Sequence, residues 1–390
     1  MPAMAEQPDQ SGPVAVYGAT GYTGRLIAQE LQRRGADFVL AGRSAEKLEA
    51  LAAELGPGAR TAAVSLDDGA ALLELLDPCA AVIACAGPFS LHGEPVVAAA
   101  VESGTHYLDT TGEQPFMKMV FDAYGERAAR AGAALVPAMG FDYVPGDMIA
   151  ALTAADMGPL DELVLAYSVR GFGMSRGTMH SALQIMLGGD VEYRDGAWHP
   201  ASQRVDRGTW EFPAPVGKQR MVRYPAGEQI TVPRHVEVRS VSTLLSAATA
   251  MPSRRLAPAA SALMPLMQLA MRTPLRRAGD ALIGRLPEGP SEDARRASRF
   301  MISCEASRGA TKRRGTITGA DVYGLTAFGI VHAALLASGS GYEGRGALAP
   351  SQAFEATDFL SALGEFGVDY EVDELPATAA AAAAAQTPRG

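Results

Sequence analysis

The chain carries the glycine-rich sequence Gly18-Ala19-Thr20-Gly21-Tyr22-Thr23-Gly24. This sequence follows the apolar run Val14–Tyr17 and precedes Arg25–Leu31, whose composition is typical of a helix. A strand, a glycine-rich turn and a helix in this order form the phosphate-binding turn of a dinucleotide-binding unit. The arrangement predicts a doubly wound parallel sheet that begins near residue 13.

Each glycine of the turn has a separate expected task. Gly18 permits the tight turn out of the strand, Gly21 lets the backbone approach a pyrophosphate, and Gly24 lets the helix pack closely on the sheet. The pyrophosphate would then lie on the free N–H groups at the helix start, where the helix dipole favours an anion. Three glycines at this spacing also fit a strand-to-helix turn that binds no ligand. Neighbouring features of the sequence must therefore distinguish a cofactor-binding turn from a purely structural one.

The end of the second predicted strand, Phe38–Gly42, favours NADP(H) as the cofactor. Arg43 follows this strand, 25 residues after Gly18, where an acidic residue would bind the ribose hydroxyls of NAD. An arginine there accommodates the 2′-phosphate of NADP instead. Ser44 can add a hydrogen bond and Lys47 a positive charge. The alternative is that Arg43 is a solvated residue at a helix start.

The composition sets wide limits on function. With 390 residues, of which 48% are hydrophobic, the chain is long enough for two domains with their own cores. A net charge of −9 argues against a nucleic-acid partner. The three cysteines have no metal-ligand spacing and are odd in number, so neither a metal site nor a disulfide framework is expected. A cytoplasmic protein fits this cysteine content.

Membrane association is expected to be peripheral at most. Residues 1–12 contain no apolar signal region, and no run approaches the roughly 20 apolar residues that span a bilayer. The segment Leu256–Ile283 is rich in methionine and flanked by arginines. It could form a lid over an acyl substrate, a homodimer surface, a peripheral membrane contact or an ordinary core helix.

The pattern along the chain predicts an α/β domain over residues 13–155 and a second, α+β domain over 156–318. Residues 319–373 are expected to form a helical segment that returns to the first domain, and 374–390 a disordered tail. The second domain should contain a mostly antiparallel sheet because its segments alternate in polarity and are separated by turn residues. Its expected strands and turn are Glu162–Val169, Val191–Tyr193, Gln219–Tyr224, Val236–Val241, Phe300–Ala306, Arg314–Ile317 and the hairpin turn Arg194–Ala197.

Three further segments carry a family resemblance together with the glycine-rich turn. They are Gly87–Val97 (GPFSLHGEPVV), His106–Glu113 (HYLDTTGE) and Gly140–Asp147 (GFDYVPGD). In these motifs the chain resembles the saccharopine dehydrogenase-like oxidoreductases, and most closely the bacterial trans-acting enoyl reductases. The resemblance is specific over residues 13–150 and looser at Tyr224–Glu228 and Pro233–His235. Tyr143 departs from the small residue that this family usually carries at its position.

The resemblance implies a stand-alone NADPH enzyme that serves lipid or polyketide assembly, with a small-molecule or carrier-bound acyl substrate. Ala86, Gly87 and Pro88, at the carboxyl end of the fourth predicted strand, are expected near the pyrophosphate or the nicotinamide ribose. Asp67, after the third strand, is assigned to the cofactor site as well. Each of these segments can also be an ordinary end of a strand.

Reduction of an activated double bond also needs a proton donor. Tyr143 is the first candidate, with His92 and Asp142 beside it in the expected crevice, and Tyr107, His180, Tyr224 and His235 as further possibilities. Tyr143 could instead be a wall of the substrate pocket, and Asp109 and Asp142 could cap the helices that follow them. The alternative functions are an imine or amino-acid dehydrogenase of the saccharopine type and a non-catalytic NADP-binding protein.

Overall fold

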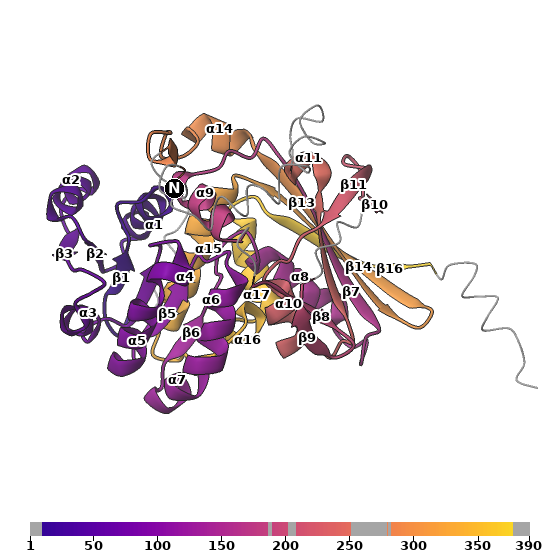
Figure 1. The fold of residues 1–390 in the computed structure, drawn as a ribbon, viewed down its shortest axis with the longest axis horizontal. Helices are drawn as coiled ribbons and strands as arrows, with labels where there is room; N and C mark the ends of the chain where they lie inside the picture. The colour runs from indigo at the N-terminus through magenta and orange to yellow at the C-terminus, as the bar shows by residue number, and fades with distance from the viewer. Residues whose placement is uncertain (1–9, 186–188, 202–207, 251–278, 280–281, 377–390) are drawn as a thin grey trace, which may run out of the picture.

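A computed structural model describes residues 10–185, 189–201, 208–250, 279 and 282–376. The N-terminal part is a parallel sheet in the strand order β15-β6-β5-β4-β1-β2-β3 (Figure 1). Its first six strands along the chain follow the order 3-2-1-4-5-6, and sheets with this order bind dinucleotides at their carboxyl edge. The strands are β1 (Val14–Tyr17), β2 (Phe38–Gly42), β3 (Arg60–Ala63), β4 (Ala81–Ala84), β5 (His106–Asp109), β6 (Ala134–Val136) and β15 (Gly346–Ala347).

Helices cover both faces of this sheet because successive strand residues point to opposite sides. Val14 and Val16 of β1 face a core that includes α1, whereas Ala15 and Tyr17 face a second core built with α3 and α5. The helices of this part are α1 (Tyr22–Arg33), α2 (Ala45–Leu55), α3 (Gly69–Leu76), α4 (Phe89–His92), α5 (Glu94–Ser103), α6 (Gln114–Met119), the π-helix η1 (Val120–Tyr124) and α7 (Gly125–Ala131).

The second sheet is mixed but mostly antiparallel. Its order is β10-β11-β12-β7-β13-β14-β16, with β8 paired to β12 and β9, and only β12 and β7 run parallel among the described pairs. The strands are β7 (Glu162–Arg170), β8 (Val191–Arg194), β9 (Ala197–Pro200), β10 (Thr209–Glu211), β11 (Lys218–Arg223), β12 (Val241–Ser246), β13 (Arg299–Arg308), β14 (Thr311–Ala320) and β16 (Asp369–Leu375).

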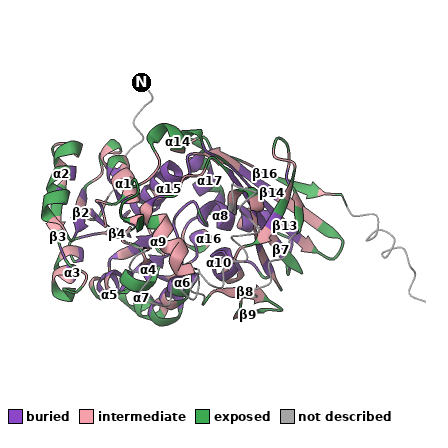
Figure 2. Cartoon of the chain, turned by 45° about the horizontal axis from the view of Figure 1, so that its top comes forward, coloured by how far each residue is buried: buried purple, intermediate pink, exposed green. Residues whose placement is uncertain are grey.

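A layer of helices lies between the two sheets and joins them into one core (Figure 2). In this layer α8 (Val144–Ala154) packs on β13 and β14, whereas α15 (Val322–Ala337) packs on α1, β4 and β5. The helix α17 (Ala356–Gly364) contacts both α8 and α15, and α16 (Pro350–Ala353) contacts α8 and β6. Residues after 320 therefore contribute to both halves of the molecule.

The shorter helices of the second half lie around its sheet. They are α9 (Arg176–Ile185), α10 (Glu228–Thr231), the 3-10 helix η2 (Val232–Arg234), α11 (Ala247–Ala250) and α14 (Glu292–Ala297). Among the residues that the structure describes, no helix has both the length and the apolar character needed to cross a membrane.

Several details differ from the sequence-based expectation. The helical segment after β5 begins at Gln114 and contains the π-helical turn Val120–Tyr124, which the sequence does not indicate. The strand predicted over Val236–Val241 is wrong, because only Val241 belongs to a strand, which then continues to Ser246. The strands β15 and β16 were not predicted, and β16 returns the end of the helical segment to the second sheet by pairing with β14.

Two predicted segments fall largely outside the described residues. Of Leu256–Ile283, only residues 279, 282 and 283 are described, so its expected role as a lid, a dimer surface, a membrane contact or a core helix stays a prediction. Of the tail expected over 374–390, residues 374 and 375 belong to β16, and residues 377–390 are outside the described range.

Candidate active site

The glycine-rich turn has the geometry of a phosphate-binding turn. Gly18 has φ +87°, and a Cβ there would lie 2.9 Å from the amide nitrogen of Ala86. A Cβ on Gly24 would overlap the carbonyl oxygen of Gly18, so this glycine allows α1 to pack closely against the turn. At Gly21 the nearest atom to a Cβ would be 3.4 Å away, which leaves the backbone open on one side.

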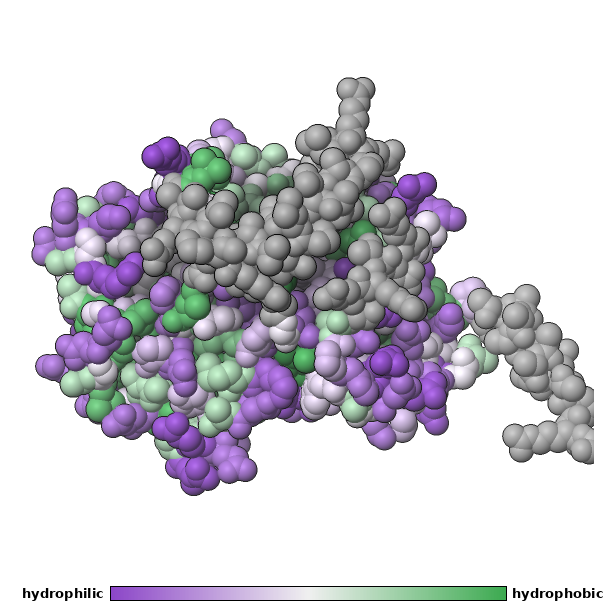
Figure 3. All heavy atoms as spheres, viewed as in Figure 1, coloured by the Kyte–Doolittle hydropathy of each residue, from purple (hydrophilic) through white to green (hydrophobic). Residues whose placement is uncertain are grey.

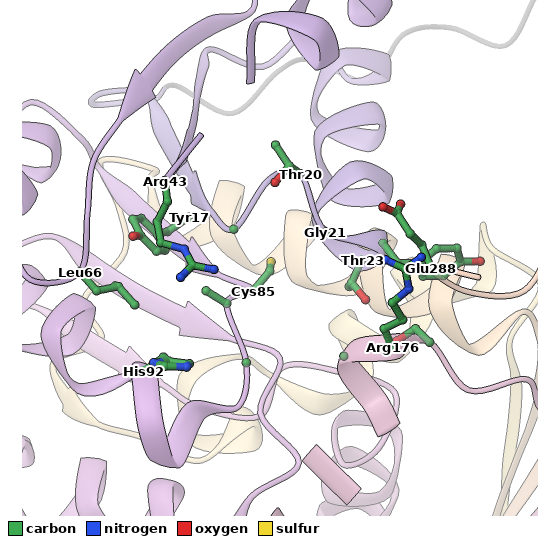
Figure 4. Close-up of a pocket in the computed structure, with 17 residues that line it drawn as sticks. Tyr17, Thr20, Gly21, Thr23, Arg43, Leu66, Cys85, His92, Arg176 and Glu288 are labelled. Atoms are coloured by element: carbon green, nitrogen blue, oxygen red, sulfur yellow. The ribbon is translucent and has the colours of Figure 1, made fainter. Parts of the chain in front are cut away.

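A pocket of about 310 Å³ opens in front of this turn (Figure 4). Because α1 begins at Tyr22, the free N–H groups of its first turn lie at the pocket and favour an anion. The predicted site residues that line the pocket are Gly18, Thr20, Gly21, Tyr22, Thr23, Arg43, Ala86, Gly87 and His92. Further lining residues are Tyr17, Gly42, Leu66 and Cys85 from the first half and Ser175, Arg176, Gly177 and Glu288 from the second.

The other predicted cofactor residues do not line this pocket. Ala19 is fully buried, and Gly24 serves the packing of α1. Ser44 caps α2, its hydroxyl oxygen accepting a hydrogen bond of 3.4 Å from the amide of Lys47. Lys47 and Asp67 are exposed near the pocket, and Pro88 follows the lining residue Gly87.

Arg43 is the basic side chain at the β2 end of the pocket. It is exposed, and no ion-pair partner is found for it in the described part of the chain. Figure 4 shows Arg43 and His92 on one side of the pocket and Arg176 on the other. A free guanidinium in this position matches the requirement for a 2′-phosphate ligand.

Beyond the pocket, the segments that follow β5, β6 and β11 bring an acid and two phenols together. A Cβ on Gly112 would lie 3.8 Å from both the Asp142 Oδ2 and the Tyr143 hydroxyl oxygen. Tyr143 is fully buried, and its hydroxyl donates a 2.8 Å hydrogen bond to the carbonyl oxygen of Gly112. The hydroxyl of the half-buried Tyr224 lies 3.5 Å from that of Tyr143. Since β4, β5 and β6 are neighbours, this cluster follows the pocket along the carboxyl edge of the sheet.

Burial shifts the pKa values of these groups. It raises the pKa of Asp142 to about 6, although part of the side chain remains accessible to solvent. Burial also raises the pKa values of Tyr143 and Tyr224 above their usual range, and the pKa of the nearby Asp190 to about 6. At neutral pH the phenols therefore keep their protons.

Two further acids near the cluster have structural contacts. Glu228 is fully buried, accepts a hydrogen bond from the Tyr167 hydroxyl, and has its pKa raised by burial to about 8. The carboxylate of Asp109 accepts hydrogen bonds from the amides of Thr111 at 2.8 Å and Ala138 at 2.9 Å. Asp109 therefore fixes the loops around the cluster instead of capping a helix.

A buried carboxylate that sequence reasoning did not single out connects the two halves of the molecule. Oε1 of Glu113 accepts hydrogen bonds of 2.9 Å from the Phe89 amide and the Ser181 hydroxyl, and Oε2 accepts one of 2.9 Å from the Ser90 amide. It therefore holds the loop after Gly87 against α9. The sequence shows Glu113 only as the last residue of a motif, with no sign of this contact.

Comparisons with known proteins agree with the geometry of the pocket. Residues 14–136 match the family model for the NADP-binding domain of saccharopine dehydrogenase. The fold and this match define a dinucleotide-binding protein whose residues 14–136 have the sequence character of an NADP-binding domain. The saccharopine dehydrogenase (L-Glu forming) of Saccharomyces cerevisiae has the same fold, with a TM-score of 0.59 at 15% identity over 94% of this chain and 100% of that chain.

Sequence relatives come from mycobacteria. The chain is 37% identical over 209 residues to Rv2449c of Mycobacterium tuberculosis, a provisionally named trans-acting enoyl reductase, covering 50% of this chain and 49% of the relative. It is 39% identical over 140 residues to a trans-acting enoyl reductase of Mycobacterium ulcerans, covering 35% of this chain and 34% of the relative. The chain thus spans about half the length, or less, of the curated relatives that it matches.

Proposed function

We propose that this protein is an NADPH-dependent reductase of an enoyl or related unsaturated carbonyl substrate, free or attached to a carrier. The observation that carries the proposal is that the Asp142–Tyr143–Tyr224 cluster lies at the same carboxyl edge of the parallel sheet as the NADP-binding pocket. The resemblance to trans-acting enoyl reductases supports the choice of an acyl substrate.

When bound, NADPH supplies a hydride to the β-carbon of such a substrate. The protein itself must orient the carbonyl group of the substrate and protonate its α-carbon. The Tyr224 hydroxyl, half-buried and uncharged at neutral pH, can donate a hydrogen bond to the carbonyl oxygen. Asp142 is accessible and has a pKa of about 6, so it can hold the proton that the α-carbon receives.

We assign the other two predicted proton donors, Tyr143 and His92, different roles. The Tyr143 hydroxyl already donates to Gly112, so we assign it the role of positioning Tyr224. His92 lies with Arg43 at the cofactor pocket, and we assign it to cofactor binding.

A second function is favoured by one observation, the acidic character of the cluster. Asp142 and Asp190 would attract a substrate that carries an amino or iminium group. This feature supports the imine or amino-acid dehydrogenase alternative. A protein that binds NADP without catalysis is the third possibility, and it predicts cofactor binding with no turnover.

The experiment measures NADPH oxidation by the purified chain with three substrate classes: an enoyl-thioester, a cyclic imine, and a 2-oxo acid with ammonium. Turnover of the enoyl-thioester supports the first proposal, and turnover of the imine or the 2-oxo acid supports the second. Asp142→Asn should lower kcat by about 10²-fold with little change in KM for NADPH. Tight NADPH binding without turnover of any class would contradict both enzymatic proposals.

A further inference from the structure

One basic residue of the second half of the molecule reaches the cofactor pocket. The second half contributes Ser175, Arg176, Gly177 and Glu288 to the pocket lining, and Arg176 is the only cation among these four. Figure 4 shows its side chain extending from the start of α9 toward Thr23 and Glu288, on the side of the pocket opposite Arg43. Arg176 therefore lies near the first turn of α1, where the glycine-rich turn is expected to hold a pyrophosphate.

The hydrogen bonds of Arg176 leave the end of its guanidinium group available. Nε donates to the carbonyl oxygen of Leu286 at 2.5 Å, and the backbone amide donates to the carbonyl oxygen of Glu288 at 3.0 Å. In the described part of the chain, no carboxylate lies within ion-pair distance of Arg176. The two Nη groups can therefore present a fork to phosphate oxygens, which an arginine binds in a bidentate manner.

The start of α9 is held firmly against the first half of the molecule. The Tyr323 hydroxyl accepts a 2.8 Å hydrogen bond from the amide of Ser175, and the ring of Tyr323 lies edge-on to Tyr22, with centroids 5.1 Å apart. The Tyr22 hydroxyl in turn donates a 2.8 Å hydrogen bond to the carbonyl oxygen of Pro290. These contacts fix Arg176 in front of the glycine-rich turn before any ligand binds.

Further along α9, Ser181 makes the contact with Glu113 described above. Its hydroxyl oxygen would lie 3.5 Å from a Cβ on Gly87, a residue of the pocket. The helix thus touches the cofactor pocket at its start and the Gly87 loop at its middle. Both contacts keep the arginine at a defined distance from the site.

We infer that Arg176 is a ligand of the cofactor pyrophosphate, so that NADP(H) is bound by both halves of the molecule. This inference rests on the NADP(H) site of the proposed function and adds a residue that the dinucleotide-binding domain itself does not contain. Arg43 and Arg176 then recognise different phosphates: Arg43 the 2′-phosphate and Arg176 the pyrophosphate. Glu288 on the same wall repels an anion, so Glu288→Gln should tighten NADPH binding.

The test measures the dissociation constants of NADPH, NADH and adenosine 2′-monophosphate by calorimetry. Arg176→Gln should weaken NADPH and NADH alike, by about 30-fold, because charge-assisted hydrogen bonds to the pyrophosphate are lost. Binding of adenosine 2′-monophosphate, which has no pyrophosphate, should not change. Arg170→Ala, which removes an exposed arginine at the end of β7, is the matched control and should not change any of the three constants.

A second measurement does not depend on a variant. Hydrogen exchange of the amides in residues 176–185 of the wild-type chain should slow when NADPH binds. Unchanged NADPH affinity in a folded Arg176→Gln variant, or unchanged exchange in α9, would overturn the inference while leaving the cofactor site intact. Failure of the wild-type chain to bind NADPH would overturn the proposed function instead.

Discussion

Arg43 lines the cofactor pocket, and we expect the preference for NADPH over NADH to depend on this side chain. We expect Arg43→Ala to weaken NADPH binding by about 30-fold and NADH binding by less than about threefold, because only NADPH carries the 2′-phosphate. Fluorescence titration with both cofactors checks this. Equal losses of affinity for NADPH and NADH would show that Arg43 does not recognise the 2′-phosphate. Equal losses are instead the result that we expect for the Arg176 variant.

At the scale of residues, the sequence indicated the cofactor end of the site better than the substrate end. The glycine-rich turn and Arg43 can be predicted because their roles follow from local geometry along β1, α1 and β2. Arg176 and Tyr224 are far from the turn in sequence, and only the packing of the second half brings them to the site. No local pattern marks Glu113 either, because its partners Phe89 and Ser181 come from separate segments.

At the scale of elements, a buried ion pair fixes α8 to its neighbours. Nε2 of His235 and Oδ1 of Asp147 are 2.9 Å apart, and Oδ2 of Asp147 accepts hydrogen bonds from the Ser351 amide at 2.9 Å and hydroxyl at 2.7 Å. Burial disfavours the charged form of each side chain, but the Asp147 carboxylate and the His235 imidazolium each stabilise the charge of the other. The pKa of Asp147 therefore lies below its usual 3.8, and the pKa of His235 lies above its usual 6.5.

The pH dependence of stability follows from these directions. The contribution of Asp147 is present above pH 3.8 and is lost as the pH falls through its lower folded pKa. The contribution of His235 is complete below pH 6.5 and is lost as the pH rises through its higher folded pKa. The pair should therefore stabilise the fold most between these two values, and part of its contribution should disappear above pH 6.5.

We expect His235→Leu to lower the free energy of unfolding by about 3 kcal/mol at pH 6, because it leaves the Asp147 carboxylate buried without its partner. Urea unfolding at pH 6 and pH 8 measures the effect, and the loss should be smaller at pH 8. The double variant Asp147→Leu/His235→Leu should recover part of the stability. An equal loss at both pH values would contradict the raised pKa of His235.

The elements of the first sheet were easier to predict than those of the second. In the parallel sheet, β1, β2 and β4 are short apolar runs that are each followed by a helical run, so the strand pattern and the helix pattern support each other. At Val236–Val241 the alternation reflects burial of Val236 and Val238, but before Val241 the sole β pairing found in the described part of the chain is the isolated bridge between Leu160 and Val238. Alternating polarity indicates which side chains are buried and does not establish that the backbone pairs in a sheet.

At the scale of the whole molecule, the helices between the sheets should couple the two halves in unfolding. Both tryptophans of the chain, Trp198 in β9 and Trp210 in β10, belong to the second sheet. We expect saturating NADP⁺ to raise the midpoint of thermal unfolding followed by tryptophan fluorescence, with a stabilisation of about 2.7 kcal/mol at one hundred times Kd. A tryptophan transition that NADP⁺ does not move would show that the halves unfold separately.

The last strand of the second sheet has a consequence for the behaviour of the molecule at high concentration. Among the described strands β16 is the last at one edge of the sheet, and such edges can pair with another copy of the chain. This strand carries four carboxylates, Asp369, Glu371, Asp373 and Glu374, and is mostly exposed. Two copies of this edge repel each other through their carboxylates, so β16 disfavours aggregation through edge pairing. A chain shortened before Asp369 would instead expose the ten residues of β14 as the edge of the sheet.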